Sequence, residues 1–167
     1  LRQEMEPKLV EIADLLEETI QTVRNIATDL RPGVLDTLGL RAAIDWQVRE
    51  FERRNGISCF SKLCQEPKHL PPEKSTALFR ILQEILTNIT RHANAKLVKV
   101  EMAKTAGEIR LTVTDDGIGI TEDQIQNPKS LGLLGMRERV VIYGGSISVT
   151  AGRAGGTVVS VQMPIKK

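Results

Sequence analysis

The chain has 167 residues, a length that suits one domain or one domain with an appendage. With 23 Lys and Arg against 21 Asp and Glu, it has no charge excess that would favour duplex nucleic acid, and one Trp, one Tyr and three Phe are too few to favour a single-strand binder. Two cysteines and two histidines at no metal-ligand spacing exclude an ordinary zinc site.

The first predicted element is a long helix from Leu9 to Leu30, whose apolar residues repeat on heptad positions and on a third position beside them. A stripe this wide suits a helix bundle, and one helix cannot bury it alone. We therefore expect a partner helix or a second copy of the protein. Pro32 and Gly33 end this helix, and a shorter one is predicted over 40–54. Because the sequence begins at Leu1, within a helical pattern, we expect it to be a piece of a longer chain.

Beyond Gly56 the pattern changes to mixed α and β. Alternating apolar residues predict strands, and longer apolar arcs predict helices. In chain order we predict a strand at 57–63, a loop at 67–72, a helix at 73–93, strands at 98–102 and 109–113, a loop at 117–135, a helix at 134–143 and a hairpin at 147–163. This order indicates an α+β fold in which helices pack on one face of a mixed β-sheet.

The strand at 109–113 leads into the run DDGIG. Asp115 continues the phase of the apolar residues from Ile109 to Val113, so its carboxylate is predicted to lie on the core side of the sheet. A buried carboxylate needs hydrogen-bond donors, from the protein or from a ligand. Gly117 and Gly119 would let a ligand or another backbone come close. A polar turn at a strand end is the alternative interpretation.

A polar stripe runs along the predicted helix at 73–93. Glu84, Asn88 and Arg91 fall in one narrow wedge away from the apolar arc. Asn is a poor helix former, and nothing local explains it in mid-helix. Carboxylate and amide oxygens are ligands that Mg²⁺ uses when phosphates and waters fill its other positions. A solvated helix face is the alternative interpretation of the stripe.

Two glycine-bearing motifs follow. SLGLLGMRERV at 130–140 places Gly132 and Gly135 at the entry of a helix, where free backbone N–H groups suit phosphate, although a plain helix entry looks the same. GGTVVSV at 155–161 places Thr157 at the start of a strand, as an ordinary hairpin also does.

Four segments of the chain resemble, in order, the four boxes of the Bergerat (GHKL) nucleotide-binding fold: QEILTNITRHA, DDGIG, GLLGMRER and GGTVVSV. This fold is shared by gyrase-type topoisomerases, heat-shock chaperones, mismatch-repair ATPases and sensor histidine kinases. Two further segments resemble those of the short-lid sensor histidine kinases of bacterial two-component systems: GMRER after a short loop, and DLRPGVLDTLGLRAAI at 29–44. The resemblance implies that 1–31 is the second helix of a dimerisation and histidine-phosphotransfer hairpin, 32–56 a linker and first catalytic-domain helix, and 57–167 the ATP-binding catalytic domain.

This resemblance implies ATP and Mg²⁺ as ligands. Asp115 would accept a hydrogen bond from the adenine amino group, Asn88 would bind Mg²⁺, and Glu84 would polarise the attacking histidine. The other implied positions are Arg91 and His92 near the phosphates, Gly117 and Gly119 in the pocket floor, Gly132 and Gly135 in the lid, and Thr157 beside Asp115 or the adenine. The family often has lysine where this chain has Arg91.

The implied enzyme is a protein-histidine kinase that passes the γ-phosphoryl group of ATP to a histidine and then to the receiver domain of a response regulator. Neither His69 nor His92 lies in a phosphoacceptor motif, so we expect the acceptor on a segment missing from this chain, and no autophosphorylation by the fragment alone. The alternatives are a degenerate, non-catalytic dimerisation module and another GHKL ATPase or serine kinase.

No apolar run in the sequence approaches the roughly 20 residues that span a bilayer. We therefore expect the catalytic portion to be cytoplasmic, with any membrane attachment made by upstream regions. The intact protein is expected to be a homodimer through its N-terminal helix.

Overall fold

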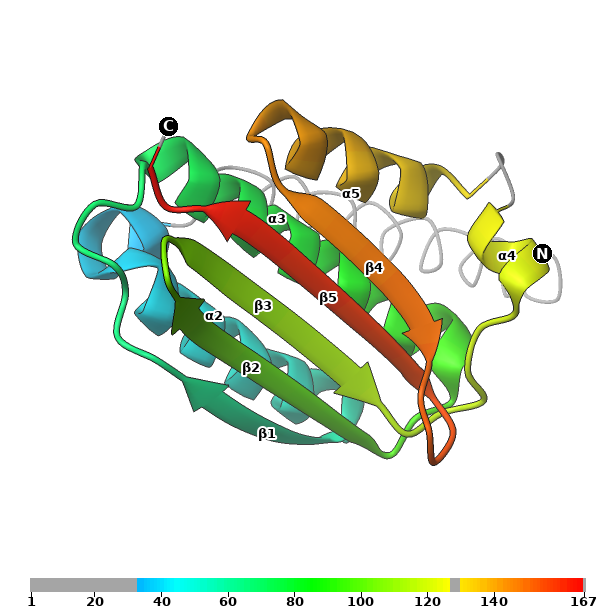
Figure 1. Cartoon of the computed structure of the whole chain (residues 1–167). Helices are drawn as coiled ribbons and strands as arrows, with labels where there is room; N and C mark the ends of the chain where they lie inside the picture. Colours follow the sequence, from blue (N-terminus) through cyan, green and yellow to red (C-terminus); the bar gives the residue numbers. More distant parts are fainter. Residues whose placement is uncertain (1–32, 127–129, 167) are drawn as a thin grey trace, which may run out of the picture.

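The computed structural model describes residues 33–126 and 130–166. Its centre is a five-stranded sheet in the order β1-β2-β3-β5-β4, in which β1 is parallel to β2 and the other neighbours are antiparallel (Figure 1). The strands are β1 (Ser58–Leu63), β2 (Leu97–Thr105), β3 (Glu108–Asp115), β4 (Ser146–Ala151) and β5 (Thr157–Pro164). The predicted mixed sheet is thus confirmed. The predicted helix at 9–30, and the dimer that it would form, lie outside the described residues.

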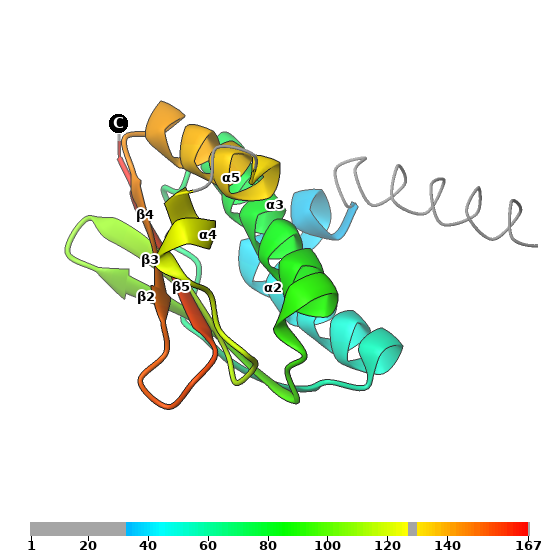
Figure 2. The same cartoon turned by 90° about the vertical axis from the view of Figure 1, so that its right-hand side faces the viewer.

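The helices lie on one face of this sheet, which Figure 2 shows edge-on with α2, α3 and α5 on the same side. They are α2 (Gly33–Asn55), α3 (Pro72–Asn88), the π-helical turn η1 (Ile89–Ala93), α4 (Glu122–Gln126) and α5 (Leu131–Ile142). The predicted α+β layer arrangement is therefore confirmed. Within the described ranges, no helix is both long enough and apolar enough to cross a bilayer.

Alternate strand residues and the inner face of α3 form the core between these two layers. The buried strand residues include Val98, Val100, Met102, Ile109, Leu111, Val113, Val159, Val161 and Met163, and α3 adds Leu78, Leu82, Ile85 and Leu86. Burying such a side chain stabilises a fold by about 1.5–3 kcal/mol relative to leaving it exposed. The intervening residues Lys99 and Glu101 are exposed on the other face. The period-2 and period-3.6 patterns of the sequence identified these faces correctly.

Helix α2 contains a kink at Gly39, whose φ of 82° lies outside the helical range. The half-buried carboxylate of Glu66 lies at this kink, where its Oε2 accepts a hydrogen bond of 2.7 Å from the backbone N–H of Leu40. The Ser75 hydroxyl of α3 donates to the other oxygen of Glu66 at 3.4 Å. The residues before Gly39, predicted as linker, are helical, and the predicted start of the next helix at Leu40 coincides with the kink.

Two elements differ from prediction between Gly117 and Gly135. A short helix, α4, lies within the predicted loop, and α5 begins at Leu131 instead of at 134. Gly132 and Gly135 favoured a loop in the sequence, because glycine in a helix costs about 1 kcal/mol relative to alanine. The apolar side of α5 outweighs that cost, because Met136 and Val140 are buried in the core.

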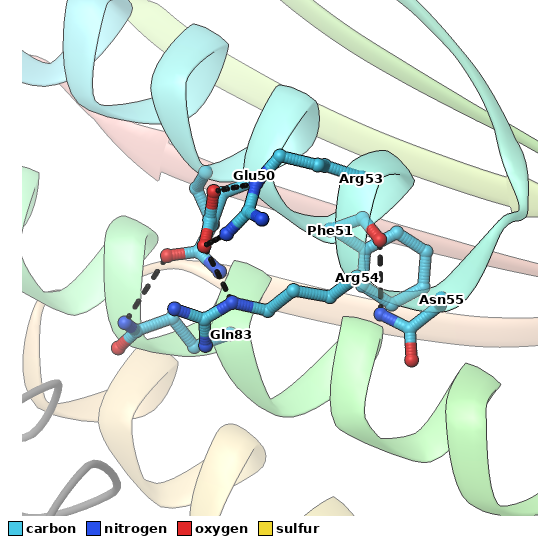
Figure 3. Close-up of polar contacts among 7 residues, drawn as sticks. Glu50, Phe51, Arg53, Arg54, Asn55 and Gln83 are labelled. Carbon is cyan, nitrogen blue, oxygen red and sulfur yellow. Dashed lines mark hydrogen bonds and ion pairs between the residues drawn. The ribbon is translucent and has the colours of Figure 1, made fainter.

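Near the end of α2, Glu50 lies between two arginines (Figure 3). Its Oε1 lies 2.6 Å from the Nη2 of Arg53 and 2.5 Å from the Nε of Arg54, and its Oε2 accepts from the Nε of Arg53 at 2.9 Å. These hydrogen bonds, those from Arg53 most strongly, lower the pKa of the Glu50 carboxyl from 4.5 to about 2. Gln83 of α3 donates to Gln47 of α2 at 3.5 Å and links the two helices beside this cluster.

The folded pKa of Glu50 lies below its ordinary value, so its stabilising contribution is present above pH 4.5 and is lost as the pH falls toward 2. We expect the difference in urea midpoint between the wild type and Glu50→Gln to be largest above pH 4.5 and to shrink as the pH falls. Glu101→Gln on the exposed face of β2 is the control. An equal pH dependence in both variants would contradict this assignment.

Candidate functional site

A pocket of about 470 Å³ lies between the helical layer and one end of the sheet. Its walls come from the last turns of α3 and from η1, from the end of β3 and the loop after it, and from the starts of α5 and β5. All but two of the site residues predicted from the sequence line it: Glu84, Asn88, Arg91, His92, Asp115, Gly119, Gly132 and Thr157. The fold therefore brings together in one cavity four motifs that are widely separated in the chain.

Asp115 ends β3 and is only 5% exposed, as the strand phase predicts. It pairs with Val98 in the register between β3 and β2. Its Oδ1 accepts a hydrogen bond of 2.9 Å from the backbone N–H of Gly117, and the residue lines the pocket. Because a buried carboxylate requires further donors, a ligand with an N–H group suits this wall of the pocket.

Gly117 does not line the pocket, which corrects its predicted place in the pocket floor. A Cβ at this position would overlap the backbone carbonyl of Ala93, so glycine is needed for the loop to approach the end of η1. The neighbouring N–H of Ile118 donates to that same carbonyl at 2.8 Å. Gly117 thus supports the floor from behind, whereas Gly119 forms part of the wall.

Gly156 lies at the same end of the sheet and was not among the predicted site residues. It has a φ of +75°, and a Cβ there would overlap the backbone carbonyl of Asp115. The double glycine before Thr157 is visible in the sequence, but the carbonyl of Asp115 that makes glycine necessary is distant in the chain. The residue allows the turn before β5 to approach the backbone of Asp115 closely.

We expect Gly156→Ala to lower the free energy of unfolding by about 2–4 kcal/mol, because it combines a strained φ with a backbone collision. Gly107→Ala is a matched control, since Gly107 has a φ of +85° but no atom within 4 Å of the added Cβ. The control should show only the conformational cost, about 1 kcal/mol. If urea unfolding shows the same loss of unfolding free energy in Gly156→Ala and Gly107→Ala, the backbone collision has no effect on stability.

The polar stripe of α3 forms one side of the pocket. Glu84 and Asn88 are half-buried there, and Arg91 and His92 are exposed at its outer end. The sequence predicted one continuous α-helix to Ala93, but its last turn is the π-helix η1, which Asn94 ends in the left-handed conformation with a φ of 50°. Single π-turns often occur at functional sites.

The first turn of α5 lies against this stripe. A Cβ on Gly132 would overlap the carboxylate of Glu84 and would lie 3.5 Å from the Nδ2 of Asn88, so a larger residue here would require the Glu84 side chain to move. Ser130 precedes the helix and makes no side-chain cap bond to it. The first N–H groups of a helix have no intrahelical acceptor, and this helix start faces the pocket. Gly135 lies one turn further on and does not line the cavity.

Apolar side chains form the remaining pocket wall, including Ile85, Ile89, Ala93, Val113, Ile118, Ile120, Leu133, Met136, Val149 and Val159. The strand residues among them follow from the predicted strand phase, although the sequence analysis did not assign them to a site. Gln124 is also a pocket residue, and it comes from α4, which the sequence analysis did not predict. An apolar slot with a few convergent polar groups is typical of a small-molecule site.

Comparison with known families matches residues 73–167 to the family described as histidine kinase-, DNA gyrase B-, and HSP90-like ATPases. The chain belongs to this ATPase family. The match includes the helix, the strands and the glycine-bearing loops that line the pocket. Membership of this family implies that the chain binds ATP.

Relatives and solved structures agree with the family. The chain is 35% identical over 153 residues to the sensor histidine kinase MctS of Rhizobium johnstonii, covering 90% of this chain and 33% of that protein. It is 30% identical to the oxygen sensor histidine kinase NreB of Staphylococcus carnosus, covering 92% of this chain and 44% of that protein. The chain thus spans less than half the length of these curated relatives.

Among solved structures, the histidine kinase domain of a blue-light activated histidine kinase from Erythrobacter litoralis is similar to this chain, with a TM-score of 0.65. It is 26% identical and covers 75% of this chain and 61% of that chain. The histidine kinase AdeS of Acinetobacter baumannii, at 15% identity, has the same fold with a TM-score of 0.65 over 92% of this chain and 84% of that chain. These matches confirm the predicted GHKL-type fold.

Proposed function

We propose that this chain is the catalytic part of a sensor histidine kinase, which binds ATP with Mg²⁺ and transfers the γ-phosphoryl group to a histidine outside this sequence. The observation that carries the proposal is that buried Asp115 and the Glu84–Asn88 stripe line one pocket. Membership of the ATPase family and similarity to the sensor histidine kinases MctS and NreB support it.

The adenine would occupy the apolar part of the pocket, with its amino group donating to the carboxylate of Asp115. This pose supplies the donor that a buried carboxylate requires. Thr157 lines the same end of the cavity and would support the carboxylate or the base. Gly119 would leave space for the ring, because its position brings backbone rather than a side chain to the pocket wall.

The phosphates would extend toward Asn88, Arg91 and His92, with the start of α5 on their other side. No cluster of three or more His, Cys, Asp or Glu side chains suited to a metal ion occurs within 33–126 and 130–166. The donor set still fits Mg²⁺, which commonly takes one or two protein oxygens and completes its shell with phosphates and waters. Asn88 would hold the ion, whose charge neutralises the phosphate oxygens during transfer.

Glu84 would accept a hydrogen bond from one imidazole N–H of the incoming histidine, so that the other nitrogen attacks the γ-phosphorus. A P–N bond forms, the bond to the bridging oxygen breaks, and ADP leaves. Because such transfer depends on positioning and charge neutralisation, the pocket needs no covalent intermediate. By the logic of two-component systems, the phosphoryl group would then pass to the receiver domain of a response regulator.

The acceptor histidine is proposed to lie outside this sequence because of where its two histidines are located. His92 is a pocket residue of η1, and His69 is exposed in the loop before α3. Residues 1–31 would belong to the dimerisation hairpin of an intact cytoplasmic homodimer, and residues 57–167 would form the catalytic domain.

Calorimetric titration with a non-hydrolysable ATP analogue, with and without Mg²⁺, tests this function. We expect micromolar binding that Mg²⁺ strengthens, and Asn88→Ala should lose most of that strengthening because it removes the amide oxygen. Thr87→Ala, on the same helix but outside the pocket lining, is the control. An unchanged Mg²⁺ dependence in Asn88→Ala would contradict the proposed metal role.

A folded wild-type chain that binds no nucleotide would favour the non-catalytic dimerisation module instead. If the longer protein binds ATP but phosphorylates serine, or only hydrolyses ATP, another enzyme of the same superfamily is indicated. Radiolabel from γ-³²P-ATP on a histidine, stable to alkali and labile to acid, would support the proposal.

A further inference from the structure

The residue after the pocket carboxylate, Asp116, is exposed and does not line the pocket. Its Oδ1 nevertheless accepts two backbone hydrogen bonds, from Lys96 N–H at 2.7 Å and from Leu97 N–H at 2.8 Å. Its own N–H donates to the carbonyl of Leu97 at 3.2 Å. These three bonds fasten the end of β3 to the start of β2.

This contact joins two chain segments that follow pocket-lining elements, η1 and β3. Lys96 and Leu97 follow η1 within a few residues, so they connect directly to the helix that carries Asn88 and His92. On the other side, Asp116 immediately follows Asp115, whose Oδ1 is held by the N–H of Gly117. The orientation of Asp115 thus depends on the backbone path of the residues that follow it.

The electrostatics of Asp116 agree with a strong contact. The backbone N–H groups of Leu97 and Lys96 hold the pKa of its carboxyl below the ordinary value. Hydrogen bonds to an ionised acceptor are stronger than those between neutral groups. An ordinary turn aspartate would cap its own turn, whereas this one binds a segment about 20 residues earlier in the chain.

We propose that Asp116 is a positioning residue for nucleotide recognition: by binding the backbone of Lys96 and Leu97, it sets the direction of Asp115 and hence the preference for adenine over guanine. This inference rests on the proposed function. Adenine offers its amino group where guanine has a carbonyl oxygen, so a fixed carboxylate accepts from the first base and repels the second. A carboxylate that is free to turn discriminates less between them.

The test is calorimetric affinity for ATP and GTP analogues in the folded chain. We expect Asp116→Ala to weaken ATP binding about tenfold and to lower the ATP to GTP affinity ratio by a similar factor, which corresponds to about 1.4 kcal/mol. Asp116→Asn retains an Oδ1 acceptor and should stay within about threefold of wild type. Asp123→Ala, exposed on α4 and outside the pocket lining, is the control.

If Asp116→Ala does not fold, Asp116→Glu gives the same test, because it keeps the charge but displaces the carboxylate by one methylene. A lowered urea midpoint with an unchanged ATP to GTP ratio would overturn the inference and leave Asp116 a purely structural residue. Asp116→Asn as weak as Asp116→Ala would also overturn it. A wild-type chain without ATP affinity would reject the proposed function itself, whereas wild-type binding with an unaffected Asp116→Ala would reject only this inference.

Discussion

Replacing Asp115 with asparagine is expected to lower the affinity for ATP by about 100-fold or more while the chain stays folded. The amide can keep the Oδ1 acceptor that receives the Gly117 N–H at 2.9 Å. It replaces the other carboxylate oxygen with an NH₂ group, however, and this donor would face the adenine amino group, which is also a donor. Because the residue is only 5% exposed, water cannot readily relieve that mismatch.

Equilibrium calorimetry measures this effect directly, and circular dichroism checks the fold. Asp45→Asn is the matched control, since Asp45 pairs with Arg49 at 2.9 Å on the surface of α2 and is not a pocket residue. The control should bind ATP like wild type. Wild-type affinity in Asp115→Asn would place the base elsewhere in the cavity.

Glu84→Gln is expected to slow phosphoryl transfer about 10²- to 10³-fold with little change in nucleotide affinity. The variant keeps the shape of the side chain beside Gly132, so the approach of α5 to the stripe should persist. It removes the negative charge that would polarise the attacking imidazole. A loss of rate without a loss of binding is the signature of an interaction made mainly in the transition state.

The rate is measured by phosphohistidine formation in a longer chain that carries the acceptor. Glu73→Gln in the first turn of the same helix is the control, because Glu73 is exposed and is not a pocket residue. A Glu84→Gln variant with wild-type transfer would remove Glu84 from the mechanism, even if ATP binding is normal.

Predictions from the sequence were correct where the local hydrophobic periodicity of a strand or helix indicates which residues are buried. The apolar alternation of β3 placed Asp115 on the buried face, and the apolar arc of α3 placed Glu84 and Asn88 on the stripe that lines the pocket. Both predictions follow from geometry that a strand or a helix repeats along its length. They did not depend on knowing which elements are neighbours in space.

Features set by contacts between distant segments could not be predicted in this way. Helix α4 is tied to the next element by two side chains, since Ser130 donates to the carbonyl of Gln124 at 3.2 Å and Arg137 to that of Ile125 at 3.3 Å. The need for glycine at Gly156 arises from a carbonyl on another strand. The π-turn likewise has no distinct residue period, and the apolar arc of the sequence continues through it.

The one-sided packing of the sheet has a practical consequence for experiments on this protein. Within the described residues, the helices cover a single face, so Lys99, Glu101 and their equivalents on neighbouring strands point to solvent rather than into the core (Figure 2). A reporter dye or a surface tether attached at Lys99 would therefore disturb neither the core nor the pocket lining. The bare face of the sheet is the natural attachment side for binding and folding measurements on this domain.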